Sequence, residues 1–147
     1  MKRLLLIFVL AMMMLGTAVA CGGTTATTTS AEPNISTDLS EALDLADTID
    51  VATVASVKDR EDVVVLDVRE QWEYDEGHIP GVTLIPMGEV ANRLSEIPTD
   101  KSVIVTCRSG NRSGQITDFL RQQGFDNVHN MDGGILAWEA AGYDVEQ

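Results

Sequence analysis

The chain has 147 residues, enough for one ordinary domain, and its formal net charge is −13. Such an acidic chain is not expected to bind nucleic acid, because proteins bind nucleic acid through basic patches. For the same reason, it is not expected to dock broadly on anionic lipid by electrostatic attraction. Against this background, residues 101–117 hold three basic residues and no acidic one. This local positive charge indicates where an anionic ligand would bind.

Residues 1–20 are typical of a targeting segment rather than of a folded element. The apolar stretch 4–15 is too short for a membrane span and suits the centre of a signal peptide. Small residues then lead to Cys21, as in a bacterial lipoprotein signal, although Ala18 stands where leucine is most usual. We therefore expect a lipid on Cys21, which would anchor the protein in the cell envelope, facing outside the cytoplasm. Ordinary secretory cleavage near Ala20, leaving a free cysteine, is the alternative.

Residues 21–47 are expected to form a flexible tether. The tract 22–30 contains only small and polar residues, and six acids with no base follow between residues 32 and 50. Within it, residues 38–46 have the spacing of a short solvated helix with a capping box. The folded domain is expected to span residues 48–147.

Predicted strands and helices alternate along this domain. Continuous apolar, β-branched runs indicate buried strands, and apolar residues at helical spacing indicate helices between them. Alternation of this kind predicts a mainly parallel sheet with helices on both faces. The strands are predicted at 63–66, 82–85, 103–106 and, more weakly, 127–131, and the helices at 90–97, at 116–120 before Gly124, and at 134–141.

Cys107 lies between the strand predicted at 103–106 and the start of a helix. Backbone N–H groups converge at such a turn, and the helix dipole is positive there. Such a position lowers a thiol pKa from about 8.5 into roughly the 3.5–7.5 range. Arg108 and Arg112 add two cations, so the sequence predicts a thiolate nucleophile and an anionic substrate.

The small number of cysteines and histidines limits the kinds of site that the chain can form. Cys21 and Cys107 are the two cysteines, and His78 and His129 are the two histidines. If Cys21 carries lipid, no partner remains for a disulfide, a redox pair or a cysteine zinc site. We expect no metal and no cofactor.

Four motifs, in order and at suitable spacing, resemble the rhodanese-like sulfurtransferase domain. The resemblance covers about residues 48–145 and implies an α/β fold with a five-stranded, mainly parallel sheet and helices on both faces. It also implies a loop from Cys107 whose backbone N–H groups surround the sulfur. The motifs are Leu66-Asp67-Val68-Arg69-Glu70, Glu76-Gly77-His78-Ile79-Pro80-Gly81-Val82, the run from Cys107 to Ser113, and Met131-Asp132-Gly133-Gly134 followed by Trp138.

The resemblance implies a thiosulfate sulfurtransferase that works through a persulfide on Cys107. A small anionic donor such as thiosulfate would give up its outer sulfur, and a thiol or cyanide would accept it. We expect a monomer that needs no nucleic acid. The residues expected to bind the donor are Arg108, Ser109, Gly110, Asn111, Arg112 and Ser113.

Asp67 and Arg69 are interpreted as bracing the loop from the neighbouring strand end, with a catalytic role as the alternative. His78 belongs to a Gly-His-Ile-Pro-Gly turn and is interpreted as structural.

Three other functions remain open. Phosphatases of this fold have a loop one residue longer, whereas four residues separate Cys107 from Arg112 here. A binding module without catalysis is the second, although such modules commonly lack the cysteine. A sulfur carrier that serves a protein partner is the third.

Overall fold

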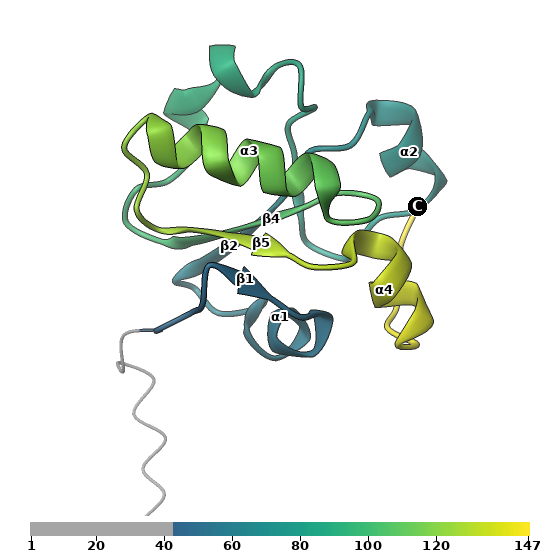
Figure 1. The fold of residues 1–147 in the computed structure, drawn as a ribbon. Coiled ribbons are helices and arrows are strands. Elements are labelled where there is room, and N and C mark those ends of the chain that lie inside the picture. Colours follow the sequence, from purple (N-terminus) through teal and green to yellow (C-terminus); the bar gives the residue numbers. More distant parts are fainter. Residues whose placement is uncertain (1–42) are drawn as a thin grey trace, which may run out of the picture. The chain divides into compact units, whose positions relative to one another are not determined.

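The computed structural model describes residues 43–147 (Figure 1). The predicted signal segment, Cys21 and most of the predicted tether lie outside these residues. The described part contains a five-stranded sheet in the order β1-β5-β4-β2-β3, and every pair of neighbouring strands is parallel. The strands are β1 (Thr48–Ile49), β2 (Val63–Asp67), β3 (Thr83–Leu84), β4 (Ser102–Thr106) and β5 (Val128–Met131).

The two central strands set the position of the site. β2 and β4 pair from Val63 opposite Ser102 to Asp67 opposite Thr106. Both strands are rich in β-branched residues and almost wholly buried, as expected for central parallel strands. Because they end together, Asp67 and Cys107 reach the same carboxyl edge of the sheet, where open α/β sheets bind ligands.

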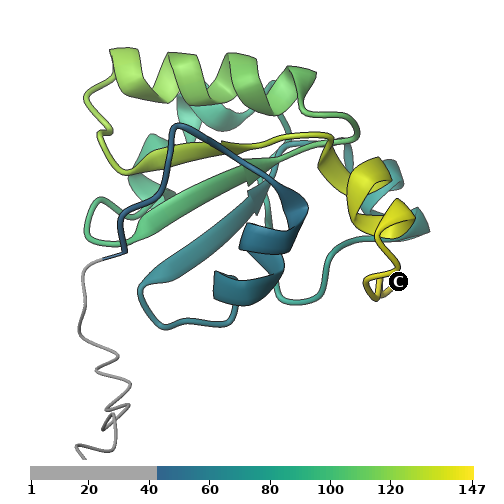
Figure 2. The ribbon, with the colours of Figure 1, turned by 60° about the horizontal axis from the view of Figure 1, so that its bottom comes forward.

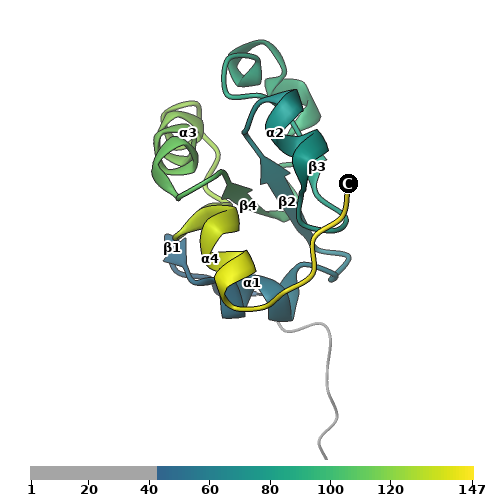
Figure 3. The same cartoon turned by 90° about the vertical axis from the view of Figure 1, so that its right-hand side faces the viewer.

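Helices cover both faces of the sheet, as predicted (Figures 1 and 2). α3 (Asn111–Gln122) packs on one face, in a core cluster that includes Val105, Ile116 and Leu120. On the other face, α1 (Val51–Val57) and α4 (Gly134–Ala140) contribute to a second cluster. α2 (Gln71–Glu76) lies at the same end of the sheet as α4 (Figure 3).

The helix predicted at 90–97 is wrong in type. The segment forms two 3-10 turns, Val90–Asn92 and Leu94–Glu96, separated by Arg93 with non-helical backbone angles. The predicted apolar residues are nevertheless buried, with Val90 at 0% and Ile97 at 5% exposure. Over so few residues the apolar spacing fits either helix type, and Asn92 and Ser95 are poor α-helix formers.

The short helix predicted at 38–46 is wrong in its described part. Residues 43–46 are not helical, and their burial alternates between half-buried and exposed, which is the period of an extended chain. Leu43 and Leu45 pack against the core, and the Arg121 guanidinium pairs with Asp47 at 3.0 Å. The residues just before Thr48 therefore pack on the folded domain, because the half-buried Leu43 and Leu45 contact the second core cluster.

Three short elements were not predicted, namely β1, α1 and α2. α1 begins where the Asp50 carboxylate accepts a hydrogen bond from the Thr53 N–H at 2.8 Å. Its sequence, VATVASV, is rich in β-branched residues, so its helical state is set by packing rather than by propensity. No helix among residues 43–147 has the length and apolar character needed to cross a membrane.

Candidate functional site

Cys107 follows β4 directly and is 1% exposed. Its sulfur accepts a hydrogen bond from the Gly110 N–H at 3.2 Å, and the Ser113 hydroxyl lies 3.4 Å away. It is the free cysteine of the described part of the chain. The loop that follows β4 therefore turns back so that its own donors face the sulfur.

These donors change the ionisation of the thiol. Burial raises the pKa of Cys107, but hydrogen bonds to the sulfur outweigh it and hold the pKa below its usual value. The Ser113 hydroxyl is the strongest of them, followed by the backbone N–H groups of Ser113, Ser109 and Gly110. These hydrogen bonds thus stabilise the thiolate form of Cys107.

The Ser113 hydroxyl has two possible partners. Its oxygen lies 3.4 Å from the Cys107 sulfur and 3.0 Å from the Gly110 carbonyl oxygen. A hydroxyl has one proton and donates to one acceptor at a time. The geometry therefore lets Ser113 bond the carbonyl while the thiol is protonated and turn to the sulfur when it ionises.

Two glycines allow the loop to take this path. Gly110 has a φ of 92°, in the left-handed region. Gly134, with a φ of 57°, lies under the loop, and a Cβ there would fall 2.3 Å from the Cys107 carbonyl oxygen. The glycine of the fourth motif thus permits the close approach of α4 to the cysteine loop.

The start of α4 also holds the loop by hydrogen bonds. The Ile135 N–H donates to the Cys107 carbonyl at 2.9 Å, and the Leu136 N–H donates to the Arg108 carbonyl at 3.1 Å. These N–H groups have no partner within their own helix, because they belong to its first turn. The loop is therefore fixed from below by backbone contacts that do not depend on side-chain identity.

Arg112 is held by a residue that the sequence did not indicate. Its Nη1 and Nη2 donate to the two carboxylate oxygens of Glu73 at 2.6 and 2.7 Å. Glu73 lies on α2 and also accepts the Glu70 N–H at 3.1 Å. The carboxylate of Glu73 thus offsets the charge of Arg112, and the donor-binding role expected for Arg112 stays a prediction.

The same pair shifts the ionisation of Glu73. Hydrogen bonding to Arg112 lowers the pKa of Glu73 from 4.5 to about 2, against the effect of burial, which raises it. The hydrogen bond from the Glu70 N–H contributes to the same lowering of the pKa. Glu73 is therefore ionised across the physiological range and connects α2 to the first turn of α3.

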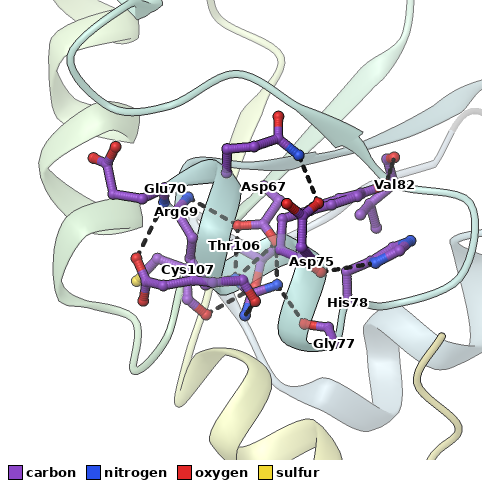
Figure 4. Close-up of polar contacts among 12 residues, drawn as sticks. Asp67, Arg69, Glu70, Asp75, Gly77, His78, Val82, Thr106 and Cys107 are labelled. Atoms are coloured by element: carbon purple, nitrogen blue, oxygen red, sulfur yellow. Dashed lines mark hydrogen bonds and ion pairs between the residues drawn. The ribbon is translucent and has the colours of Figure 1, made fainter. Parts of the chain in front are cut away.

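Asp67 and Arg69 form a buried pair at the end of β2 (Figure 4). The Arg69 Nη2 lies 2.7 Å from Asp67, and the two side chains are 5% and 2% exposed. The guanidinium also donates to the carbonyls of Glu73 and Gly77 at 3.1 and 2.9 Å. The pair thus fixes α2 and the turn after it, and it is connected to the cysteine loop through Glu73, which binds Arg112.

His78 has structural contacts, as interpreted from the sequence. Its ring stacks on Tyr74 with centroids 3.6 Å apart, and its Nδ1 lies 3.1 Å from the Tyr74 carbonyl (Figure 4). Its Nε2 lies 3.3 Å from the Glu146 carboxylate. These contacts hold the C-terminal segment beside the turn that follows α2.

Arg108 differs from the other arginines of this region. It is exposed and forms no ion pair with any residue between 43 and 147. It lies on the wall of a pocket of about 590 Å³ between α2 and α4. The lining residues are Arg69, Trp72, Glu73, Glu76, Gly77, Arg108, Ile135, Leu136 and Glu139.

The predicted site residues thus divide into three groups. Cys107, Ser109, Gly110 and Ser113 are brought together around the sulfur. Arg108 faces the pocket, and Asn111 is exposed at the start of α3. Asp67, Arg69 and Arg112 belong to the support of the loop.

Glu73 also supports the loop but was not predicted from the sequence. It lies 39 positions before Arg112, so no local sequence pattern could have paired the two residues. No group of three or more His, Cys, Asp or Glu residues in the described part is arranged to hold a metal ion.

Known proteins similar to this chain belong to one family. The family described as "Rhodanese-like domain" matches residues 50–141. A "Sulfurtransferase" from Allochromatium vinosum is 44% identical over 87 residues, which cover 59% of this chain and 81% of that protein. A "Thiosulfate sulfurtransferase GlpE" from Pseudoalteromonas translucida is 39% identical over 93 residues, covering 63% of this chain and 89% of that protein.

A solved structure gives the same result for the fold. The crystal structure of a rhodanese-related protein from Thermoplasma volcanium superimposes with a TM-score of 0.63 at 34% identity. The match covers 69% of this chain and 98% of that one.

Proposed function

The chain belongs to the rhodanese-like family of sulfurtransferase and sulfur-carrier domains, and we propose that it transfers a sulfane sulfur through a persulfide on Cys107. Thiosulfate or a similar anion is the proposed donor, and a thiol, or cyanide in an assay, is the proposed acceptor. The similarity to a thiosulfate sulfurtransferase supports this choice of donor.

The observation that carries the proposal is the set of donors around one buried sulfur. The Gly110 N–H lies 3.2 Å from it, and the Ser113 hydroxyl lies 3.4 Å from it. Sulfur transfer needs a polarisable nucleophile that forms and breaks an S–S bond, and a stabilised thiolate meets this need. The same donors would stabilise the terminal sulfur of a persulfide anion.

The proposed reaction has two half-reactions. The Cys107 thiolate attacks the outer sulfur of thiosulfate, an S–S bond forms, and the bond to the sulfonate sulfur breaks so that sulfite leaves with the electron pair. An acceptor thiolate then attacks the outer sulfur of the Cys107 persulfide. The acceptor leaves as a persulfide and the Cys107 thiolate is regenerated, so charge and atoms balance in each step.

Arg108 is the residue best placed to hold the donor anion. It is exposed and unpaired among the described residues, while both terminal nitrogens of Arg112 bind Glu73. A charge-assisted contact of this kind contributes about 1.5–3 kcal/mol. The donor would therefore approach Cys107 from the pocket between α2 and α4.

Intact-mass measurement on the full chain after thiosulfate treatment tests the proposal. We expect one added sulfur atom, mapped to Cys107, and its removal by cyanide as thiocyanate. The Cys21→Ser variant should gain the sulfur and the Cys107→Ser variant should fold but not gain it. The proposal is contradicted if Cys107→Ser still transfers sulfur, or if the protein hydrolyses an aryl phosphate faster than it uses thiosulfate.

A sulfur-carrier role is the second candidate. A "Putative sulfur carrier protein YrkF" from Bacillus subtilis is 41% identical over 78 residues, which cover 42% of that protein. A carrier would load sulfur on Cys107 as above but would release it slowly to small thiols and rapidly to its protein partner. Comparing the rates of the two half-reactions distinguishes the roles.

We propose, finally, that Cys21 carries a lipid that anchors the protein in the cell envelope outside the cytoplasm. The support is the sequence of residues 1–21, with its basic start, apolar stretch and small residues before the cysteine. Cys21→Ser should move the protein from the membrane fraction to the soluble fraction. Unchanged fractionation of this variant would overturn the anchoring proposal.

A further inference from the structure

Two helices line the pocket beside Arg108, and each contributes one apolar side chain and one glutamate to it. α2 places Trp72 and Glu76 four residues apart, and α4 places Leu136 and Glu139 three residues apart, and all four line the pocket. Residues at these spacings share one face of a helix. Each helix therefore presents an apolar side chain and a carboxylate to the same space, at the end of the sheet seen in Figure 3.

The apolar members of these walls are unusually exposed. Trp72 is 62% exposed and Leu136 is 43% exposed, and they are two of the three large hydrophobic side chains exposed in the described part. Tryptophan is enriched at the energetic centres of protein interfaces, where a partner covers it. A two-atom acceptor such as cyanide has no surface with which to cover either side chain.

Among the pocket residues that form no ion pair, negative side chains outnumber positive ones. Arg69 is neutralised by Asp67, and Glu73 is neutralised by Arg112. The remaining charged lining residues are Arg108, Glu76 and Glu139, none of which pairs with a residue between 43 and 147. Within residues 43–147, the pocket thus has one cation without an ion pair, which could bind a donor anion, and an excess of negative charge that would favour a basic partner.

The pocket also reaches the reacting loop. The amides of Ile135 and Leu136, two lining residues, hold the carbonyls of Cys107 and Arg108. The sulfur of Cys107 is buried, and the outer sulfur of its persulfide would lie about 2 Å beyond it. An acceptor seated in the pocket is therefore next to the loop that carries the sulfur.

We propose that this pocket docks the sulfur acceptor, and that the acceptor is a cysteine on a peptide or protein surface with a basic and an apolar residue beside it. The inference rests on the proposed sulfur transfer and names the acceptor class of that site. The basic residue is bound by Glu76 and Glu139, and the apolar residue packs between Trp72 and Leu136. Donor and acceptor thus use oppositely charged parts of one pocket.

Single-turnover transfer from the persulfide-loaded full chain tests this docking. Three short synthetic peptides with one cysteine each are compared, in which the cysteine is flanked by Leu and Lys, by Leu and Glu, or by Gly and Lys. We expect the Leu/Lys peptide to react about tenfold faster than the Leu/Glu peptide at low ionic strength, because opposite charges steer and hold it. The difference should shrink as salt is added.

Variants of the pocket distinguish the charged contact with the peptide from the apolar contact. Glu76→Gln together with Glu139→Gln should remove most of the preference for Lys over Glu, while Trp72→Ala should remove the preference for Leu over Gly. Glu89→Gln, an exposed glutamate that pairs with Arg93 outside the pocket, is the matched control and should change neither preference.

The loading step keeps this test separate from that of the proposed function. Thiosulfate loading of Cys107 is measured in every variant, and the glutamate variants should load at least as fast as the original chain. Normal loading with equal transfer to all three peptides overturns the docking proposal and leaves sulfur transfer standing. Failure of the original chain to load overturns the proposed function and, with it, the docking.

Discussion

The cysteine loop, residues 107–113, and the support segment, residues 67–78, meet at the carboxyl edge of the sheet and use their polar groups in opposite ways. In the loop, donors converge on the Cys107 sulfur. In the support segment, charged groups satisfy one another, as in the pair of Asp67 and Arg69, each of which is almost fully buried. The cysteine loop thus keeps hydrogen-bond donors available for a reactant. The charged groups of the support segment bind one another and make that segment rigid.

The difference teaches how the loop is held without using its reactive atoms. The support segment reaches the loop through the Glu73 carboxylate, which binds Arg112 at the far end from Cys107. On the other side, α4 binds loop carbonyls and leaves the N–H groups free to face the sulfur. Positioning and chemistry are thus assigned to different groups of the same short loop.

Removing the Asp67 carboxylate should have the largest effect on folding. Asp67→Asn leaves the Arg69 guanidinium buried without its counter-charge, which costs about 3–5 kcal/mol of the free energy of unfolding. Urea denaturation measures this cost. Asp62→Asn is the matched control, because Asp62 pairs with Arg60 at the same spacing but in a half-exposed position. The control should cost much less, because an exposed ion pair adds little to stability, and equal losses in both variants would contradict a buried support.

Glu73→Gln should have the next largest effect, and this effect should depend on pH. Because folding lowers the pKa of Glu73 from 4.5 to about 2, its ionisation stabilises the protein above pH 4.5 and loses this effect as pH falls towards 2. The shift corresponds to about 3 kcal/mol at most, and partial exposure of Arg112 reduces it to roughly 2 kcal/mol.

The measurement is the difference in unfolding free energy between the original chain and Glu73→Gln, taken at pH 7 and at successively lower pH. The difference should shrink below pH 4.5. Glu89→Gln, in an exposed pair with Arg93, should show a much smaller difference from the original chain. A Glu73→Gln difference that does not change with pH would mean that the Arg112 pair is not what stabilises the loop.

The arrangement of donors around the Cys107 sulfur could be predicted from sequence because it is local. Cys107, Gly110 and Ser113 lie within seven residues, and the strand before them and helix after them fix their arrangement. The strands predicted at 63–66 and 103–106 were confirmed for the same reason, since each is a short apolar run that is almost wholly buried. The strands predicted at 82–85 and 127–131 were confirmed as the shorter β3 and β5.

The support could not be predicted because its contacts join distant residues. Glu73 and Arg112 are 39 positions apart, and α2 has only six residues, too few to show a helical apolar period. At 90–97 the apolar positions were predicted and the helix type was not, because hydrogen bonds from Arg93 to Val90 and from Ile97 to Leu94 satisfy the same spacing. Asp67 and Arg69 were interpreted as bracing, but the intermediary, Glu73, was missed.

Ser113→Ala should act mainly on the sulfur and only secondarily on folding. The variant removes the hydroxyl that most strongly lowers the pKa of Cys107, so the pKa should rise and the fraction of thiolate at pH 7 should fall. Alkylation measured across a range of pH should therefore reach its plateau at a higher pH than in the original chain. Ser109→Ala keeps the backbone donor and is the control; equal rates in all three proteins would show that the hydroxyl does not stabilise the thiolate.

Arg108→Ala should have the smallest effect on folding and a clear effect on the donor. Arg108 is exposed and pairs with no residue between 43 and 147, so the free energy of unfolding should change by less than about 0.5 kcal/mol. Loading of Cys107 by thiosulfate should nevertheless slow by about tenfold or more, mainly through a higher KM, because a charge-assisted contact with the donor is lost.

Two further variants serve as controls. Arg108→Lys keeps the charge and should recover part of this loss. Arg112→Ala should reduce stability as well as loading, because it leaves Glu73 unpaired. If Arg108→Ala loads normally while Arg112→Ala loses loading and remains fully stable, the assignments of the two arginines are reversed, and Arg112 must exchange Glu73 for the donor.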